Sequence, residues 1–344
     1  MELTDSQIKD LMLVTLNELG RGRFTQIAQE LQEYEVMSNL LKKEKVIFDS
    51  GKGIQRTIMT KVGGTFRHVG LHSQDEVNIS DLLDKINITW KHGTAYWAWE
   101  RREMLENRGK ALIVNIIKPR RAAAMIDIAQ GMEEAFFAEP DPSDKLVPYG
   151  IKYWIVKNST LGFNGGNPTG FGNCAGIDSD EVPAWKNYTG EYTDISKLDL
   201  VKKLRKAHRK TNWKSPVTIQ DFRGPMGQKR RLYVNEETLS DIEDLGEAQN
   251  ENLGRDIASM DDQIVFKKHP IVWVPYLDDD STNPVYMIDR STFYPVILKG
   301  DYMRETEPEK APKQHNTFVI YVDITYNYLC IDRRRNAVFS LAAA

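Results

Sequence analysis

The chain has 344 residues, which is long for a single hydrophobic core and predicts two or more packing units. Its hydrophobic share of 41% and charged share of 28% are typical of a globular protein and exclude wholesale disorder. The net charge of −3 excludes the simplest nucleic-acid-binding class, because proteins that grip phosphate backbones carry a basic excess. The short basic run Arg333–Arg335 is expected to be a solvated face.

Two cysteines occur, Cys174 and Cys330, and neither has a C-x-x-C partner. This pattern argues against a zinc site or a disulfide framework and favours a reducing compartment. The first residues, MELTDSQIKDLMLV, carry acids where a signal peptide has a basic patch. No apolar stretch approaches the ~20 residues that span a bilayer, so we expect a soluble, intracellularly made protein with no membrane partner.

Residues 4–45 predict two amphipathic helices. Thr4 and Gln7 form a capping box, and glycines at 20 and 22 end the first helix. Apolar residues recur at helical spacing in both segments. They are Ile8, Leu11, Met12, Leu16 and Leu19, and then Ile27, Leu31, Tyr34, Met37 and Leu41. Two such stripes at one end of a chain need a further surface to cover them.

The hydrophobic period then changes to two. INITWKH alternates as a strand does, and VIFDSGKGIQRTIMTKVGG reads as its partner, with a tip at about residues 69–84. The prediction is a hairpin of ~40 Å if each arm holds a dozen residues at ~3.3 Å each. Two strands alone in water are marginally stable, so this hairpin either folds onto its own core or lies across a neighbour.

The next segment predicts a long helix over 111–139, which Pro119 either kinks or divides. Residues 150–315 mix short strands and turns with two modest helices, at 199–210 and 236–250. The stretch IVWVPYLDDDSTNPVYMID indicates strand, turn and strand. A final unit, TFVIYVDITYNYLCIDRRRNAVFSL, indicates a long strand, an Arg-rich turn and a return strand. This order predicts the α+β class, since no regular βαβ alternation occurs.

A glycine-rich stretch, GFNGGNPTGFGNCAG at 162–176, contains the dinucleotide pattern G-x-G-x-x-G/A at Gly170, Gly172 and Ala175. A working fingerprint joins a strand to a helix whose N-terminus faces the pyrophosphate. Here the preceding residues form a turn sequence, and the following residues contain Pro183 and no helical period. We interpret the stretch as a structural loop.

Other chemical candidates are no stronger. Cys174 and His208 would make a thiol–base pair only if the fold brought them together. The acidic run 278–280 lacks the glycine and distant glutamate of a calcium loop. The six histidines show no metal-ligand spacing. The sequence therefore predicts no catalytic residue, no cofactor, no metal and no enzyme activity.

Three long stretches carry a resemblance. They are PYGIKYWIVKNSTLGFNGGNPTGF (148–171), AQNENLGRDIASMDDQIVFKKHPIVWVPYLDDDSTNPVY (248–286), and GDYMRETEPEKAPKQH with DITYNYLCIDRRR (within 300–335). With these stretches the chain resembles the major capsid proteins of tailed bacteriophages, which have the Hong Kong 97-type fold. The resemblance covers nearly the whole chain and rests on length and order, because none of the stretches has a catalytic signature.

The resemblance implies names for the parts. Residues 1–45 would be the N-terminal arm, 46–103 the extended E-loop hairpin, 104–150 with 316–344 the peripheral domain with its spine helix, and 151–315 the axial domain. It implies pentamers and hexamers that build an icosahedral head around double-stranded DNA, bound without sequence specificity. It also implies a portal and, because only some 45 residues precede the hairpin, a separate scaffolding protein. A decoration protein, assembly in the host cytoplasm and a final place in the virion belong to the same expectation.

The residues expected at contacts between subunits are apolar. At the hairpin tip they are Leu71, Val77, Ile79 and Leu82, along its return arm Trp90, Trp97 and Trp99, and on the arm Leu11, Leu31 and Tyr34. Two alternatives remain at this stage: an encapsulin-like cargo compartment of the same fold, and a nucleotide-binding enzyme that uses the 162–176 loop.

Overall fold

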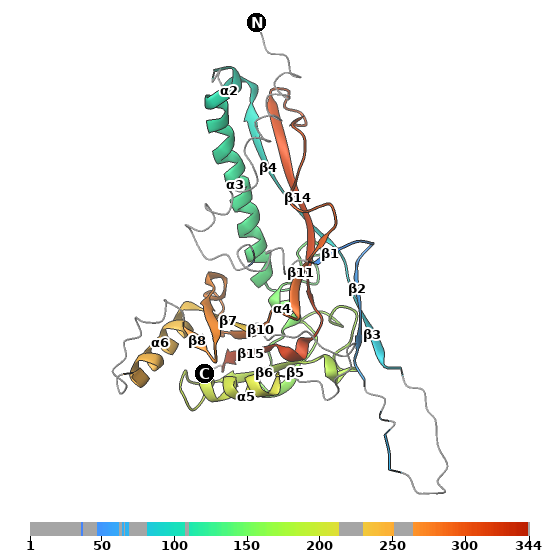
Figure 1. Ribbon diagram of the computed structural model, residues 1–344, viewed down its shortest axis with the longest axis vertical. Helices are drawn as coiled ribbons and strands as arrows, with labels where there is room; N and C mark the ends of the chain where they lie inside the picture. Colours follow the sequence, from blue (N-terminus) through green and yellow to red (C-terminus); the bar gives the residue numbers. More distant parts are fainter. Residues whose placement is uncertain are drawn as a thin grey trace.

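The computed structural model describes residues 36, 47–61, 64, 66–68, 81–106, 110–212, 230–250 and 264–342. They form two β-sheets, a separate two-stranded hairpin and helices (Figure 1). The predicted α+β class is confirmed. The two expected helices of residues 4–45 lie outside the described residues, apart from Val36. That residue is buried, and its backbone N–H donates to the Glu133 carboxylate at 2.8 Å.

The first sheet is built around one long strand, β14 (Thr317–Cys330). Its path runs β1 (Ile47–Asp49), β11 (Phe293–Leu298), β14 and β12 (Arg304–Glu305), and β4 (Lys91–Glu100) and β13 (Glu309–Lys310) also pair with β14. β4 runs antiparallel to β14 over ten residue pairs, from Glu100↔Thr317 to Lys91↔Tyr326. This ladder extends along the upper half of the molecule in Figure 1.

The second sheet has the order β5 (Gly162–Gly165), β6 (Asn187–Tyr192), β15 (Ala337–Leu341), β10 (Val285–Asp289), β7 (Arg230–Val234), β9 (His269–Trp273) and β8 (Val265–Phe266). Its helices are α5 (Leu200–Lys210), which packs beside β6, and α6 (Glu236–Asn250), which packs beside β9. Both helices were predicted within one residue of their observed ends.

The long helix α3 (Lys110–Phe137) runs beside β4 and follows the short α2 (Arg101–Glu106). At 1.5 Å per residue its 28 residues span about 42 Å. It is helical on both sides of Pro119, so Pro119 does not divide it. The prediction for this segment is confirmed to within two residues at each end.

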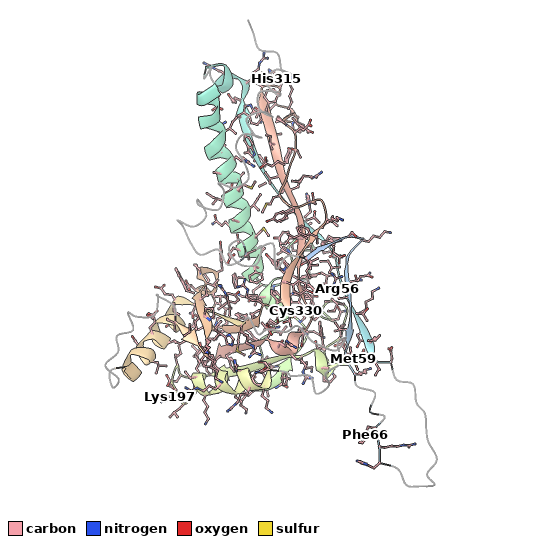
Figure 2. All side chains as sticks on the ribbon, in the orientation of Figure 1. Arg56, Met59, Phe66, Lys197, His315 and Cys330 are labelled. Carbon is pink, nitrogen blue, oxygen red and sulfur yellow. The ribbon has the colours of Figure 1, made fainter. Side chains whose placement is uncertain are left out.

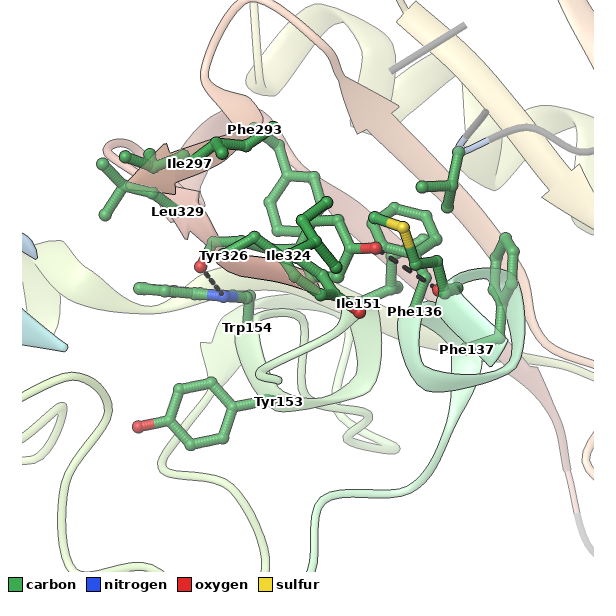
Figure 3. Packing of buried hydrophobic residues seen from close by; sticks show 14 of the residues in the cluster. Phe136, Phe137, Ile151, Tyr153, Trp154, Phe293, Ile297, Ile324, Tyr326 and Leu329 are labelled. Atoms are coloured by element: carbon green, nitrogen blue, oxygen red, sulfur yellow. Dashed lines mark hydrogen bonds between the residues drawn. The ribbon is translucent and has the colours of Figure 1, made fainter. Parts of the chain in front are cut away.

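The main core forms where the end of α3 meets α4 (Ile151–Trp154) and the strands of the first sheet. Figure 3 shows Phe136 and Phe137 from α3, Trp154 from α4, Phe293 of β11 and residues of β14 in one buried cluster. The Trp154 indole N–H donates to the carbonyls of Tyr149 and Tyr328, at 3.1 and 3.2 Å. The polar atom of this large buried ring is therefore satisfied.

The last two strands do not pair as a long strand and a return strand, which corrects the expectation from the sequence. β14 lies in the first sheet, whereas β15 runs parallel to β6 and antiparallel to β10 in the second. Residues 316–344 therefore contribute to both sheets. The chain passes between the sheets again from β10 to β11, and the Ile331 N–H donates to the Thr292 carbonyl at 3.0 Å where the two crossings meet.

The basic run 333–335 is not a solvated face. It forms a short 3₁₀ turn, η7 (Arg333–Arg335), in which Arg333 and Arg335 are buried and Arg334 is exposed. The Arg333 guanidinium donates to Trp154 O at 2.6 Å, Gly166 O at 2.7 Å and Ser179 Oγ at 2.9 Å. These hydrogen bonds fix η7 to segments near Trp154, Gly166 and Ser179, at the point where the two sheets join.

Candidate subunit interface

The hairpin predicted near residue 86 is present, and its described ladder has six residue pairs. β2 (Ile54–Met59) pairs with β3 (Leu83–Ile88) in antiparallel register, from Ile54↔Ile88 to Met59↔Leu83. β4 does not continue the return arm, because it pairs with β14 in the first sheet. Figure 1 shows the hairpin leaving the body of the molecule beside the second sheet.

The apolar side chains of the hairpin change from buried to exposed along its length. At the base, Ile54, Ile86 and Ile88 are buried in the main core. At the outer end of the ladder, Met59 is 47% and Leu83 58% exposed. Figure 2 shows Met59 where the hairpin leaves the body and Phe66 beyond it. Burial of such side chains stabilises by ~25 cal/mol per Å² of apolar surface, and nothing in the described chain covers them.

The base of the hairpin is held by the glycine-rich segment. The Asn87 N–H of β3 donates to the Ala175 carbonyl at 2.9 Å, and the Ala175 N–H donates to the Tyr153 hydroxyl at 2.9 Å. The Trp185 indole N–H donates to the Cys174 carbonyl at 3.2 Å. Ala175 and Gly176 both have positive φ, at 55° and 90°, and form a tight turn against β3. The segment therefore supports the hairpin.

The same segment has no dinucleotide-site geometry. The element that follows it in the chain is a three-residue 3₁₀ turn, η3 (Pro183–Trp185), where a dinucleotide fingerprint requires an α-helix. The prediction of a structural loop is confirmed. Cys174 is fully buried, and burial raises the pKa of its thiol, so the reactive thiolate is disfavoured. Within the described part of the chain, no group of three His, Cys, Asp or Glu side chains is placed to hold a metal ion.

A second exposed apolar area lies at the edge of the first sheet. Phe48 of β1 is 52% exposed and meets Tyr302 edge to face, with 6.1 Å between the ring centroids. Ile47 beside it is also exposed. β1 ends the path of this sheet and pairs in parallel with β11. The sequence predicted residues 47–49 to be part of the hairpin strand, and their pairing with β11 corrects that expectation.

The residues predicted at subunit contacts have different environments. Leu82 and Trp90 are half-buried, and the Trp90 indole N–H donates to the Gly51 carbonyl at 2.9 Å. Trp97 and Trp99 lie inside the subunit's own core, which corrects their placement on an exposed hairpin arm. The remaining predicted residues lie outside the described ones. They are Leu11, Leu31, Tyr34, Leu71, Val77 and Ile79.

Strand alternation explains the correction on β4. Trp97 and Trp99 point to one face, where Trp99 stacks on Phe318 of β14 with 5.7 Å between the ring centroids. Tyr96 points to the other face and is 68% exposed. The alternation was visible in the sequence, but it does not say which face is covered. Tyr96 replaces the two tryptophans as the exposed aromatic residue of this strand.

Two histidines meet between α5 and β9 and give the second sheet a pH-dependent element. His208 Nε2 and His269 Nε2 are 3.3 Å apart. Burial, with Arg230 and Lys267 nearby, lowers the pKa of His208 to about 4 and also lowers the pKa of His269. The unfolded chain, with histidine pKa ≈ 6.5, then binds more protons than the folded chain below pH 6.5.

We therefore expect the melting temperature of the subunit to fall as the pH drops from about 6.5 toward 4. His208→Gln removes one of the titrating groups, so the melting temperature of this variant should change less over the same interval. The measurement is thermal unfolding by circular dichroism in steps of half a pH unit. His315→Gln, at an exposed histidine, is the control and should keep the wild-type slope. Equal slopes for wild type and His208→Gln would contradict the assignment.

Comparisons with known proteins give the class of fold. No protein-family model matches the chain, and no curated protein matches it in sequence. Among solved structures, the capsid of the native GTA particle matches with a TM-score of 0.57 and 11% identity over 91% of this chain and 92% of that chain. The capsid asymmetric unit of cyanophage A-1(L) matches with a TM-score of 0.54 and 12% identity over 86% and 89%. The capsid of the Myoviridae phage XM1 matches with a TM-score of 0.51 and 8% identity over 86% and 90%.

This likeness shows that the chain has the fold of tailed-phage major capsid proteins. The resemblance seen in the sequence is thereby confirmed at the level of the fold. No helix among the described residues is long and apolar enough to cross a membrane.

Proposed function

We propose that this protein is the major capsid protein of a tailed phage and assembles as pentamers and hexamers into an icosahedral head around double-stranded DNA. The observation that carries the proposal is the hairpin, whose apolar side chains become exposed as it leaves the body, at Met59 and Leu83. A monomer gains nothing from such an extension, whereas a ring of copies covers it with the surface of the next subunit. The role is structural, and its work is done by extended contacts.

The parts of the chain receive their capsid names within this proposal. Residues 1–45 are the arm, the hairpin within 46–103 is the E-loop, and α3 is the spine helix of the peripheral domain. The second sheet is the axial domain, which adds β15 to the expected range 151–315. The near-neutral charge suits a shell that a motor fills with DNA, because a strongly basic lining would trap the entering strand. A separate scaffolding protein, a portal and a decoration protein are the expected partners, and the virion is the expected location.

The direct test removes the hairpin tip. Replacing residues 71–81 with a short Gly-Ser linker should leave a folded, soluble subunit that no longer forms closed shells, because the contact with the next subunit is lost. Assembly is followed by light scattering and electron microscopy, and folding by circular dichroism. Particles of normal size from this variant would contradict the proposal.

A milder pair of variants separates the hairpin surface from general apolar exposure. Met59→Asp with Leu83→Asp should strongly reduce the yield of shells. Leu146→Asp, at a more exposed residue between α3 and α4, should assemble as the wild type does. Equal yields from the two variants would remove the special role of the hairpin.

A further inference from the structure

The two helices of the second sheet carry equal and opposite charge. α5 has the sequence LVKKLRKAHRK, with six Lys or Arg and no acid. α6 has the sequence EETLSDIEDLGEAQN, with six Asp or Glu and no Lys or Arg. In a chain of net charge −3, this separation places a concentrated positive surface and a concentrated negative surface on one sheet.

Both charged faces point to solvent. The buried residues of α5 are Leu200, Leu204 and Ala207, and its opposite side is exposed at Lys202, Arg205, Lys206, Arg209 and Lys210. On α6 the exposed acids are Glu236, Glu237, Asp241, Glu243 and Asp244. Residues three and four apart on a helix are neighbours at ~5–6 Å, so each helix presents a continuous stripe of one sign.

The two stripes do not neutralise each other inside the subunit. Among the side chains that the structure describes, no ion pair joins α5 to α6, and the ion pair found on α5 is the one from Lys203 to Asp199. α5 lies along the lower side of the second sheet in Figure 1, whereas α6 projects to the left of it. The charges therefore face different surroundings.

Each charged helix also has an exposed apolar residue beside it. Leu198, two residues before α5, is 82% exposed. On the other side, Trp273 lies on β9, the strand beside α6, and is also exposed. Exposed charge alone gives weak contacts, whereas charge around an apolar centre is typical of a protein–protein interface.

We infer that α5 of one copy binds α6 of the next copy and that this helix pair fixes the order of subunits around a ring. The two surfaces differ, so the contact is head to tail, and a head-to-tail contact that closes produces a ring. Complementary charge also sets the direction, because α5 against α5 or α6 against α6 places like charges together. The inference rests on the proposed capsid function and names residues that would hold the capsomer together.

Double-stranded DNA is the other chemistry that a basic helix could bind. The observations favour a second copy, because α6 supplies an equal number of acids that a neighbouring copy can present to α5. DNA binding is therefore kept as an outcome of the test.

The test reverses the exposed charges of each helix. The α5 variant carries Lys202→Glu, Arg205→Glu and Lys206→Glu. The α6 variant carries Asp241→Lys, Glu243→Lys and Asp244→Lys. Glu and Lys are both good helix formers, so the helices should persist. Lys145→Glu, Lys299→Glu and Lys313→Glu reverse three exposed cations elsewhere and form the control.

Each reversed variant alone should form less than a tenth of the wild-type amount of rings and shells, measured by sedimentation and electron microscopy. The control should assemble normally. One chain that carries both reversals should assemble again, because the charges are complementary once more. An equimolar mixture of the two single-helix variants should form rings only by alternation, and therefore hexamers without pentamers. Normal assembly by either single-helix variant would overturn the inference.

A cross-linking experiment keeps the inference separate from the proposed function. Chains with Lys206→Cys and with Asp244→Cys are mixed under mild oxidation at high protein concentration. A disulfide-linked dimer of the two different chains should exceed either like-with-like dimer at least fivefold. Without that excess the helix pairing is wrong, even if shells form. With that excess and no shells, the pairing stands and the capsid proposal fails.

DNA is tested with a 50-base-pair duplex at 150 mM salt in a gel-shift assay. Wild type and the α5-reversed variant should bind the duplex equally weakly. Binding that α5 reversal abolishes, with assembly unchanged, would assign the basic helix to DNA and overturn the inference.

Discussion

Replacing Arg333 with methionine should lower the free energy of unfolding by about 3 kcal/mol, because each buried polar group left without its hydrogen-bond partner costs ~1–3 kcal/mol. Methionine has a similar reach but cannot donate hydrogen bonds. The Trp154 carbonyl and the Ser179 hydroxyl would then lose a buried donor, and the part-buried Gly166 carbonyl would lose its donor as well. The measurement is urea unfolding of the free subunit, monitored by tryptophan fluorescence.

The neighbouring arginine is the matched control for this prediction. Arg334 is exposed, and its guanidinium lies over the Phe163 ring at 4.6 Å. An exposed contact of this kind contributes at most ~1 kcal/mol, so Arg334→Met should stay within that range of wild type. If Arg333→Met and Arg334→Met lose the same amount, Arg333 does not hold the junction of the sheets.

The second large effect is expected from Gly150→Ala, which should destabilise the subunit by about 3 kcal/mol through steric overlap. Gly150 precedes α4 and lies against the last turn of α3. A Cβ on Gly150 would be 2.2 Å from the Phe136 carbonyl oxygen and 2.7 Å from that of Ala135. Both are backbone atoms of a helix, so neither can rotate away. The φ of Gly150 is −75°, which alanine adopts freely, so backbone strain does not contribute.

Replacing a glycine within α3 should have the opposite effect on stability. Gly131 lies within α3, is exposed, and a Cβ there would meet no atom within 4 Å. Gly131→Ala should therefore stabilise the subunit by up to ~1 kcal/mol, through helix propensity. Thermal and urea unfolding of the two variants compare them directly. A neutral Gly150→Ala would show that α3 and α4 are less closely packed than described.

Sequence patterns predicted the elements of this fold better than their partners. The helices at 110–137, 200–210 and 236–250 follow from hydrophobic period and from proline and acid placement, which are local properties. The pairing of β4 with β14 joins residues more than two hundred positions apart, and alternation within one strand carries no information about such a partner. Because the sequence does not reveal the partner of β4, Trp97 and Trp99 were predicted to lie on the hairpin arm.

The role of Arg333 was missed for a related reason. Three consecutive arginines are typical of a solvated turn. The groups that accept hydrogen bonds from buried Arg333 are mostly backbone carbonyls, and every residue type has one, so the sequence does not mark them. In contrast, the glycine-rich segment was interpreted correctly, because a dinucleotide site requires a following helix and the sequence shows none.

The position of β14 along the chain has a consequence for synthesis on the ribosome. This strand pairs with β4, β11, β12 and β13. The other strands of the first sheet therefore lack their common partner until residue 330 has left the exit tunnel. Until then β4 presents two tryptophans and an unpaired edge, which are features that recruit chaperones. A nascent chain therefore cannot complete the first sheet until its last strands have been synthesised.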